Sequence, residues 1–187
     1  MYKIYIKECE ESLTDPVFER LLPLLPEDRI KKALRYRNIV DRNNCVVTYI
    51  MLKNALQECF RVDEFTMQYD NLGKPFLKEY PNIHFSISHC KIGCAVAVAD
   101  QLIGIDIQNI VTFSENVARR VCCLQELQIL EQSEDKDRDF IRMWAMKESY
   151  VKMTGEGIYK DFKTINTTEL NGIEIEEKDD LIISVCL

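Results

Sequence analysis

One turn of a predicted helix carries a carboxylate and two ammonium groups that could act on a phosphoryl group. Glu148 and Lys152 are four residues apart and share a helix face, and Lys147 lies about 100° around the helix from Glu148. The helix should end at Thr154-Gly155, because glycine is the usual stop just past the last turn. Taken alone, this turn could be a solvated ion pair contributing about 0.3–0.5 kcal/mol. It could also bind a metal ion and a polyphosphate and move a proton.

A predicted strand over residues 103–107 offers a second carboxylate. Gly104, Asp106 and Gln108 share one face of this strand, and the isoleucines between them share the other, which belongs in a core. Asp106 could bond to turn amides at the end of the strand. Alternatively, Asp106 and Glu148 converge on one divalent cation. Magnesium takes few protein carboxylates and fills its other positions with water and phosphate oxygens, so two acids and the Gln108 amide oxygen would suit it.

The composition indicates a globular protein. The chain has 187 residues, of which 47% are hydrophobic, enough for one large domain or two small ones. The net charge of −7 argues against broad nucleic-acid binding. No apolar run approaches the ~20 residues that span a membrane, and the first residues show no signal-peptide pattern. We therefore expect a cytoplasmic location, with no membrane or nucleic acid as partner.

The periodicities predict mixed helices and antiparallel strands in two lobes, with residues 1–110 as an N-terminal α+β lobe and residues 111–187 as a C-terminal one. The predicted strands are 2–7, 65–69, 83–89, 93–99, 103–107, 172–176 and 181–186. The predicted helices begin near residues 15, 26, 41 and 114, and the last contains the turn around Glu148. The helix beginning at Ser114 should run to about Leu130, with Val117, Val121 and Leu124 facing inward.

Positive charge is concentrated in one segment, where only Asp41 opposes it. The segment is either a solvated helix face or a local anion site on an acidic protein. Its basic residues are Arg29, Lys31, Lys32, Arg35, Arg37 and Arg42.

The cysteines are interpreted as reduced, buried apolar residues. There are 8 of them and only 2 histidines, and no Cys-x-x-Cys pair is present. Closely spaced zinc ligands are therefore missing.

Taken together, three motifs resemble those of the Sfp-type 4′-phosphopantetheinyl transferases. The first is Gly73-Lys74-Pro75 followed by Phe85-Ser86-Ile87-Ser88-His89, and the second is Ile103-Gly104-Ile105-Asp106-Ile107-Gln108. The third is the helical run Trp144–Lys152. The element order from Pro26 to Gly157 is also similar to that family.

The resemblance implies a two-lobed, pseudo-twofold fold with its site in a cleft between the lobes. It implies transfer of the phosphopantetheine arm of coenzyme A to a serine of an apo acyl or peptidyl carrier protein, with release of 3′,5′-ADP, by a monomeric enzyme. Asp106 and Glu148 resemble the family's magnesium ligands, with Gln108 at a third position. The residues that resemble its coenzyme A contacts are Lys31, Arg42, Lys74, Ser88 and His89, with Lys147 and Lys152 at the pyrophosphate.

The chemistry itself asks for a base and for positive charge. A serine hydroxyl that attacks phosphorus must lose its proton, so Glu148 is the candidate general base. Magnesium, Lys147 and Lys152 could stabilise the charge that builds on the phosphoryl oxygens. His89 could instead be a structural residue at a strand end. Ser88 and His89 point to opposite faces of a strand, so they are a poor nucleophile–base pair.

Departures from the family pattern leave alternatives open. The family usually has glutamate where this chain has Gln108, which offers an oxygen but no charge. The chain could therefore bind coenzyme A or a carrier protein without turnover. The helix around residues 114–130 could supply an apolar docking surface for a carrier protein, or simply pack in the core.

Overall fold

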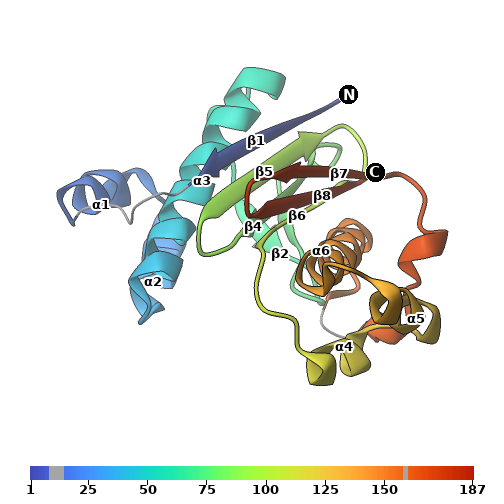
Figure 1. Cartoon of the computed structure of the whole chain (residues 1–187). Helices are drawn as coiled ribbons and strands as arrows, with labels where there is room; N and C mark the ends of the chain where they lie inside the picture. The colour runs from blue at the N-terminus through green and yellow to red at the C-terminus, as the bar shows by residue number, and fades with distance from the viewer. Residues whose placement is uncertain (9–14, 158–159) are drawn as a thin grey trace.

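The computed structural model describes residues 1–8, 15–157 and 160–187 (Figure 1). Cys9 lies outside the described residues, as does the rest of the segment 9–14. The described elements are helices and antiparallel strands, as the sequence predicts, and they form two three-stranded sheets and one two-stranded ribbon.

The first sheet has the strand order β1-β5-β4, with β1 at Tyr2–Glu8, β5 at Gly93–Ala99 and β4 at His84–His89. β5 is buried at every residue because it is the central strand and has a neighbour on each side. The long helix α3 (Ile39–Phe60) covers one face of this sheet, and Leu52 and Leu56 pack there against Val96 and Val98. The ribbon of β2 (Met67–Tyr69) and β3 (Pro75–Leu77) lies beside β4.

The second sheet has the strand order β6-β8-β7, with β6 at Gly104–Asn109, β8 at Leu181–Cys186 and β7 at Ile173–Lys178. The helix α6 (Lys136–Thr154) packs against β6 and β8 (Figure 1). Each three-stranded sheet therefore carries one long helix. β6 precedes residue 110 but pairs with β8 near the C-terminus, so the division of the chain at residue 110 stays a prediction.

Serine side chains join the two sheets where β4 meets β6. The amide of Ile105 donates to Ser86 Oγ (3.0 Å), and the amide of Ile107 donates to Ser88 Oγ (3.3 Å). The isoleucines of β6 are fully buried among the alanines of β5 and the apolar residues of β8, which confirms their predicted place in the core. These two bonds pair the buried backbone amides of Ile105 and Ile107 with side chains of β4, as buried polar groups require.

Three further helices and their connections complete the N-terminal part. α1 (Asp15–Leu21), a short 3₁₀ turn η1 (Leu22–Leu24) and α2 (Glu27–Arg35) pack on the start of α3. Asn38 caps α3 by accepting a hydrogen bond from the amide of Val40 (2.8 Å). The helix starts predicted near residues 15, 26 and 41 are therefore confirmed.

The helix predicted from Ser114 to Leu130 is wrong, because it is two helices. α4 (Glu115–Val121) ends at Cys122, and α5 (Leu124–Gln132) begins after Cys123, whose backbone is extended. The amide of Cys123 donates to Glu126 (2.8 Å), so Cys123 occupies the cap position of a capping box. The break turns Leu124 outward, where 81% of it is exposed, and Val117 is also exposed rather than facing inward.

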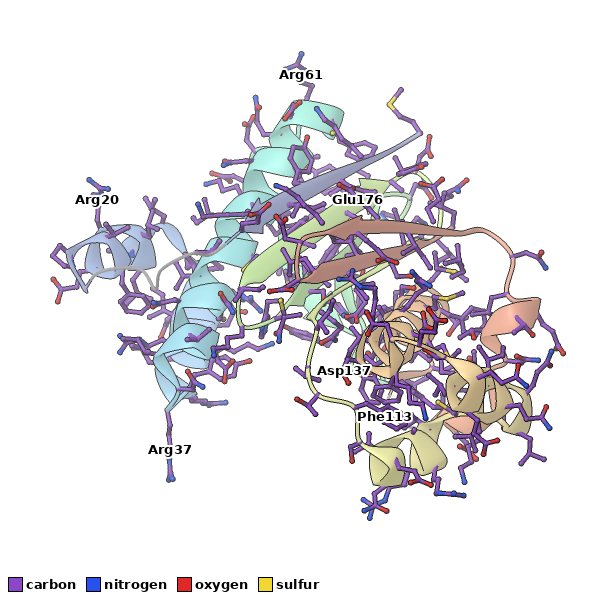
Figure 2. The ribbon with its side chains drawn as sticks, viewed as in Figure 1. Arg20, Arg37, Arg61, Phe113, Asp137 and Glu176 are labelled. Carbon is purple, nitrogen blue, oxygen red and sulfur yellow. The ribbon has the colours of Figure 1, made fainter. Side chains whose placement is uncertain are left out.

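The start of α6 lies in a strongly charged segment. The helix begins at Lys136 because Asp135 caps it by accepting from the amide of Arg138 (3.1 Å). The amide of Phe113, just before α4, donates to Asp137 in the first turn of α6 (2.8 Å; Figure 2). At its other end α6 stops at Gly155 in the left-handed conformation (φ 82°), as expected.

The C-terminal part ends in the 3₁₀ turns η3 (Phe162–Thr164) and η4 (Thr167–Glu169) and the hairpin of β7 and β8. No disulfide joins any two cysteines in the described ranges. No helix in those ranges combines the length and the apolar character needed to cross a membrane.

Gly104 fixes how closely α6 approaches β6. A Cβ at residue 104 would lie 1.9 Å from the carbonyl oxygen of Ser149 and 2.5 Å from the amide nitrogen of Met153. Both atoms belong to the backbone of α6, so they could make room only if the helix moved. Below this contact, Ser149 Oγ and Ser184 Oγ share a buried hydrogen bond (2.8 Å) that aligns α6 with β8.

We expect Gly104→Ala to lower the free energy of unfolding in urea by about 3 kcal/mol, since the new methyl group pushes α6 away from β6. Gly93→Ala is the matched control, because its Cβ would meet side-chain tips and no backbone, Ile107 Cδ1 at 2.9 Å and the Leu181 methyl groups at 3.5 Å, and should cost about 1 kcal/mol or less. Equal unfolding free energies for the two variants would show that the contact at residue 104 does not hold α6 in place.

Candidate functional site

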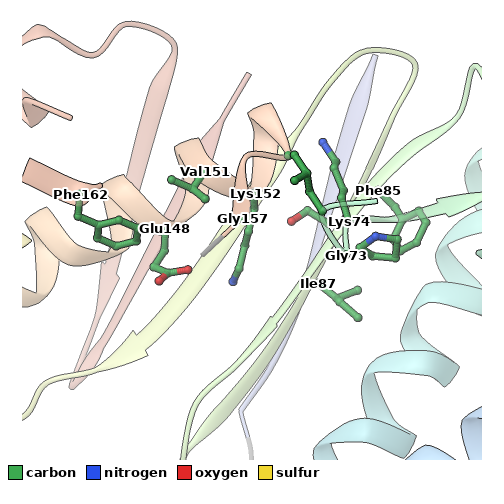
Figure 3. Close-up of a pocket in the computed structure, with 13 residues that line it drawn as sticks. Gly73, Lys74, Phe85, Ile87, Glu148, Val151, Lys152, Gly157 and Phe162 are labelled. Carbon is green, nitrogen blue, oxygen red and sulfur yellow. The ribbon is translucent and has the colours of Figure 1, made fainter. Parts of the chain in front are cut away.

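A cavity of about 380 Å³ lies between α6, strand β4 and the turn that leads into β3 (Figure 3). Lys74 and Phe85 lie at one end, and Glu148 and Phe162 lie at the other (Figure 3). Its further lining residues are Leu72, Gly73, Pro75, Ser86, Ile87, Val151, Lys152, Gly155 and Gly157. The first and third sequence motifs therefore meet at one cavity, although about 70 residues separate them along the chain.

Glu148 presents its carboxylate to the cavity from α6. Burial raises the pKa of this carboxyl above its ordinary value, and the charge of Asp106 raises it further against the opposing effect of Lys152. Within the described part of the chain, Glu148 makes no hydrogen bond or ion pair. A half-buried carboxyl group with a raised pKa and no bonded partner is available to accept a proton or to bind a cation.

Asp106, on β6, is almost fully buried and is held by three neighbours. Its Oδ1 accepts hydrogen bonds from Ser88 Oγ (2.7 Å) and from the ammonium group of Lys152 (2.6 Å). Lys152 also donates to Ser88 Oγ (2.8 Å), so the three side chains form a closed triangle. β4, β6 and α6 each contribute one member, so the triangle joins all three motifs.

Gln108 directs its amide group at Asp106. Gln108 Nε2 donates to Asp106 Oδ2 at 2.9 Å, and only the nitrogen of the amide can face a carboxylate oxygen, since two acceptors would repel each other. A carboxylate offers about four acceptor positions, and Ser88, Lys152 and Gln108 use three of those on Asp106.

The donor set in this region fits magnesium. Asp106 Oδ2 keeps an acceptor position, and the nearby Glu148 carboxylate is unbonded, with a pKa raised by burial and, to a smaller extent, by the charge of Asp106. Two hard oxygen donors, with water and phosphate oxygens for the rest, are what magnesium favours. In the described ranges no group of three or more histidine, cysteine, aspartate or glutamate side chains could hold a metal ion.

Lys74 is partly buried, and its ammonium group donates to the carbonyl oxygen of Met153 (2.6 Å), in the last turn of α6. Burial lowers the pKa of Lys74. A lysine at the C-terminal end of a helix is stabilised there by the helix dipole. Lys74 thus lines the cavity and also ties the turn after β2 to α6.

The remaining predicted phosphate contacts lie outside the lining of the cavity. His89 ends β4 on the surface, and partial burial lowers the pKa of its imidazole, with Lys152 and Lys32 adding to the effect and Asp41 opposing it. These neighbours bring the start of α3 and the basic helix α2 close to His89. Lys31, on α2, forms an exposed ion pair with Glu27.

Arg42, near the start of α3, stacks its guanidinium group on the Phe18 ring at 4.4 Å. The contact ties α3 to α1 and leaves the role of Arg42 toward coenzyme A a prediction.

Lys147 does not join this group, which corrects the expectation that two ammonium groups flank Glu148. Its side chain is fully buried, and Nζ is bonded to Glu126 (2.6 Å), to Val121 O (2.8 Å) and to Phe162 O (2.9 Å). An ammonium group has three N–H donors, and all are used inside the protein. The 100° turn between residues 147 and 148 sends Lys147 to the side of α6 that faces α5.

Sequence reasoning missed two residues of this region. Phe162 lines the cavity from a turn that shows no periodicity and no motif. Glu126 was hidden because its capping box has cysteine where serine or threonine would have signalled a helix start.

In the comparisons with known proteins, the matching family model and the similar curated proteins are all 4′-phosphopantetheinyl transferases. Residues 102–185 match the model of the 4′-phosphopantetheinyl transferase superfamily. The chain is 25% identical over 162 residues to the 4′-phosphopantetheinyl transferase psf-1 of Bacillus pumilus, covering 84% of this chain and 70% of that protein. It is 26% identical over 160 residues to the 4′-phosphopantetheinyl transferase Sfp of Bacillus subtilis, covering 83% and 71%.

A further relative and a solved structure are also similar to the chain. The 4′-phosphopantetheinyl transferase HetI of Nostoc sp. is 29% identical over 171 residues, covering 86% of this chain and 70% of that protein. The holo-[acyl-carrier-protein] synthase of Thermotoga maritima aligns with a TM-score of 0.34 and 16% identity, over 44% of this chain and 60% of that one. The sequence matches, rather than this structural alignment, carry the assignment.

We expect Lys152→Met to lower the free energy of unfolding by about 3 kcal/mol in the presence of a chelator, because the buried Asp106 carboxylate loses its charged partner. Lys31→Met is the matched control: it removes an exposed ion pair and should leave stability unchanged. Urea titrations of the wild type and both variants measure the effect. A Lys152→Met protein as stable as the control would contradict the triangle of Asp106, Lys152 and Ser88.

Proposed function

We propose that the chain is an Sfp-type 4′-phosphopantetheinyl transferase, which transfers the 4′-phosphopantetheine arm of coenzyme A to a serine of an apo acyl or peptidyl carrier protein; its match to the superfamily model and its similarity to psf-1 and Sfp support this proposal. The other product is 3′,5′-ADP. The observation that carries this proposal is the pairing of an unbonded carboxyl group of raised pKa, Glu148, with the Lys152 ammonium group at one cavity.

Glu148 is the proposed general base. The serine Oγ of the carrier protein forms a bond to the phosphorus that bears the pantetheine arm, its proton goes to Glu148, and the bond from that phosphorus to 3′,5′-ADP breaks. A carboxylate in water is a weak base, and its strength rises with its pKa. The burial and the Asp106 charge that raise the pKa of Glu148 therefore suit it to this step.

Lys152 is the proposed charge partner of the transferred phosphoryl group. Its ammonium group is part exposed at the cavity while bonded to Asp106 and Ser88, so its position is fixed before any ligand binds. A fixed charge costs no reorganisation when negative charge develops beside it. Lys74, Ser88, His89, Lys31 and Arg42 are the further proposed contacts of coenzyme A.

Asp106 and Glu148 would hold magnesium, which would neutralise charge on the pyrophosphate when bound. Gln108 acts through Asp106, because its amide nitrogen orients Oδ2. Because residue 108 is glutamine, this site has one carboxylate fewer than the family usually has.

The proposed partner is an acidic carrier protein that meets this acidic chain in the cytoplasm. Because both proteins carry negative charge, their attraction must come from a local basic or apolar surface. The exposed Leu124 and Val117 leave the helices α4 and α5 available for this role. We further propose a monomer with lobes at residues 1–110 and 111–187.

A second candidate function is coenzyme A binding without turnover. The observation in its favour is the Gln108 amide, which bonds to Asp106 where a third carboxylate would add charge.

The direct test is the intact mass of an apo carrier protein after incubation with this protein, coenzyme A and magnesium. We expect a gain of one phosphopantetheine arm with the wild type. Glu148→Gln keeps the size of the side chain but removes the base, so we expect its rate to fall about 10²–10⁴-fold. The far-ultraviolet circular dichroism of the variant should match that of the wild type.

Glu131→Gln on the exposed side of α5 is the control for losing one carboxylate. Transfer by Glu148→Gln at the rate of this control would contradict the assignment of the base. Binding of coenzyme A with no mass gain on several carrier proteins would favour the second candidate function.

Gln108→Glu should lower the magnesium concentration at half-maximal rate, because a third carboxylate then faces the cation. The same variant should unfold at a lower temperature than the wild type in chelator, since the hydrogen bond to Asp106 is replaced by repulsion between like charges. Gln101→Glu, an exposed substitution that adds the same charge elsewhere, is the control. A magnesium curve identical to that of the control would mean that residue 108 does not face the metal.

A further inference from the structure

A buried ion pair lies between α6 and α5, next to the cavity-lining residue Phe162. Lys147 is 1% exposed and Glu126 is 0% exposed. A buried pair of charges is favourable only when hydrogen bonds satisfy the remaining donors and acceptors. Lys147 meets this condition, because the carbonyl oxygens of Val121 and Phe162 accept its two other N–H groups.

The Glu126 carboxylate is satisfied on both oxygens. Oε1 accepts from the amide and from the hydroxyl of Thr167 (2.9 and 2.8 Å). Oε2 accepts from Lys147 and from the amide of Cys123. Hydrogen bonds and burial have opposing effects on this group: burial alone would raise the pKa of Glu126, and its partners bring it below the ordinary value.

The Lys147–Glu126 pair is therefore bonded to several segments that are separate along the chain. Lys147 belongs to α6 and Glu126 to α5, and their further partners lie at the end of α4 and in η3 and η4. Apart from the bond to Phe162 O, these bonds involve no residue that lines the cavity. The polar groups that are used here are mostly backbone groups, so the pair fixes the path of the chain rather than single side chains.

One of these segments forms a wall of the cavity. The carbonyl oxygen of Phe162 accepts a hydrogen bond from Lys147, and the Phe162 ring lines the cavity beside Glu148 (Figure 3). The same ring also contacts Trp144, with ring centroids 5.5 Å apart. Neighbouring residues of α6 thus hold the wall and the proposed base: Lys147 anchors Phe162, and Glu148 faces it.

We propose that the Lys147–Glu126 pair is a positioning device, which holds the Phe162 wall against α6 and keeps Glu148 in its working geometry. Lys147 then acts on the reaction through Phe162 and α6, without touching coenzyme A. A displacement of about 1 Å in such a support can cost about 10²-fold in rate. The inference rests on the proposed function for its rate measurement and on the contacts above for its structural part.

The test compares Lys147→Met, Glu126→Gln and the double variant with the wild type. We expect each single variant to lower kcat of arm transfer about 10–100-fold while KM for coenzyme A changes less than about threefold. The double variant should be no slower than the slower single variant, because both substitutions break the same pair. Lys163→Met, an exposed lysine in the same turn as Phe162, is the control and should keep the wild-type kcat.

Tryptophan fluorescence reports on the wall independently of activity. Trp144 is the only tryptophan of the chain and contacts Phe162, so its emission should shift in both single variants and stay unchanged in Lys163→Met. Thr167→Val removes one hydrogen bond of Glu126 and leaves the ion pair intact, so it should show the same changes to a smaller extent. If Lys147→Met or Glu126→Gln does not fold, the kcat and the Trp144 emission of Thr167→Val are compared with those of the wild type instead.

Two results would overturn the positioning role. A rise of more than about tenfold in KM for coenzyme A in Lys147→Met, with Glu126→Gln unchanged, would make Lys147 a direct ligand contact. Unchanged kcat and unchanged Trp144 emission in the folded variants would also overturn it. Failure of the wild type to transfer any arm would instead contradict the proposed function, and the Trp144 emission would then decide whether the pair holds the wall.

Discussion

Helix α6 lies so close to strand β6 that a single Cβ at residue 104 would overlap the carbonyl oxygen of Ser149. This contact sets the distance between the two elements that carry the acidic residues of the site. Asp106 lies two residues beyond Gly104 on the same strand face, and Glu148 directly precedes Ser149 on the helix. The charge of Asp106 contributes to the raised pKa of Glu148, and the close approach of the two backbones depends on glycine at residue 104.

The cost of bringing two carboxylates together is offset by nearby donors. Lys152 and Ser88 bond one oxygen of Asp106, and Gln108 bonds the other, so the buried charge of Asp106 is compensated. Glu148 is left without such bonds and responds with a raised pKa. The asymmetry suits two different roles: a fixed acidic anchor on the strand, and a carboxyl group on the helix that can exchange a proton or bind a cation.

Much of the fold and part of the site could be predicted from local patterns. The isoleucines at 103, 105 and 107 alternate with Gly104 and Asp106, and this period of two places them in the core. The spacing of Glu148 and Lys152 likewise places both at the cavity. These predictions succeeded because each depended on the geometry of one element.

The failures depended on contacts between elements that are distant in sequence. Lys147 looked equivalent to Lys152 until its partner Glu126, 21 residues earlier, was located beside it. The break between α4 and α5 depends on a cysteine in a cap position, where its small apolar character gives no signal. Phe162 reaches the cavity because Lys147 bonds to its backbone, which no sequence pattern expresses.

The most direct measurement is a crystal structure with coenzyme A and manganese, in which anomalous scattering locates the metal. The account predicts one anomalous peak shared by the carboxylates of Asp106 and Glu148, next to the pyrophosphate, with Lys147 still bonded to Glu126. A peak elsewhere, or coenzyme A bound with its pyrophosphate away from both carboxylates, would contradict the proposal that β6 and α6 together form the catalytic centre.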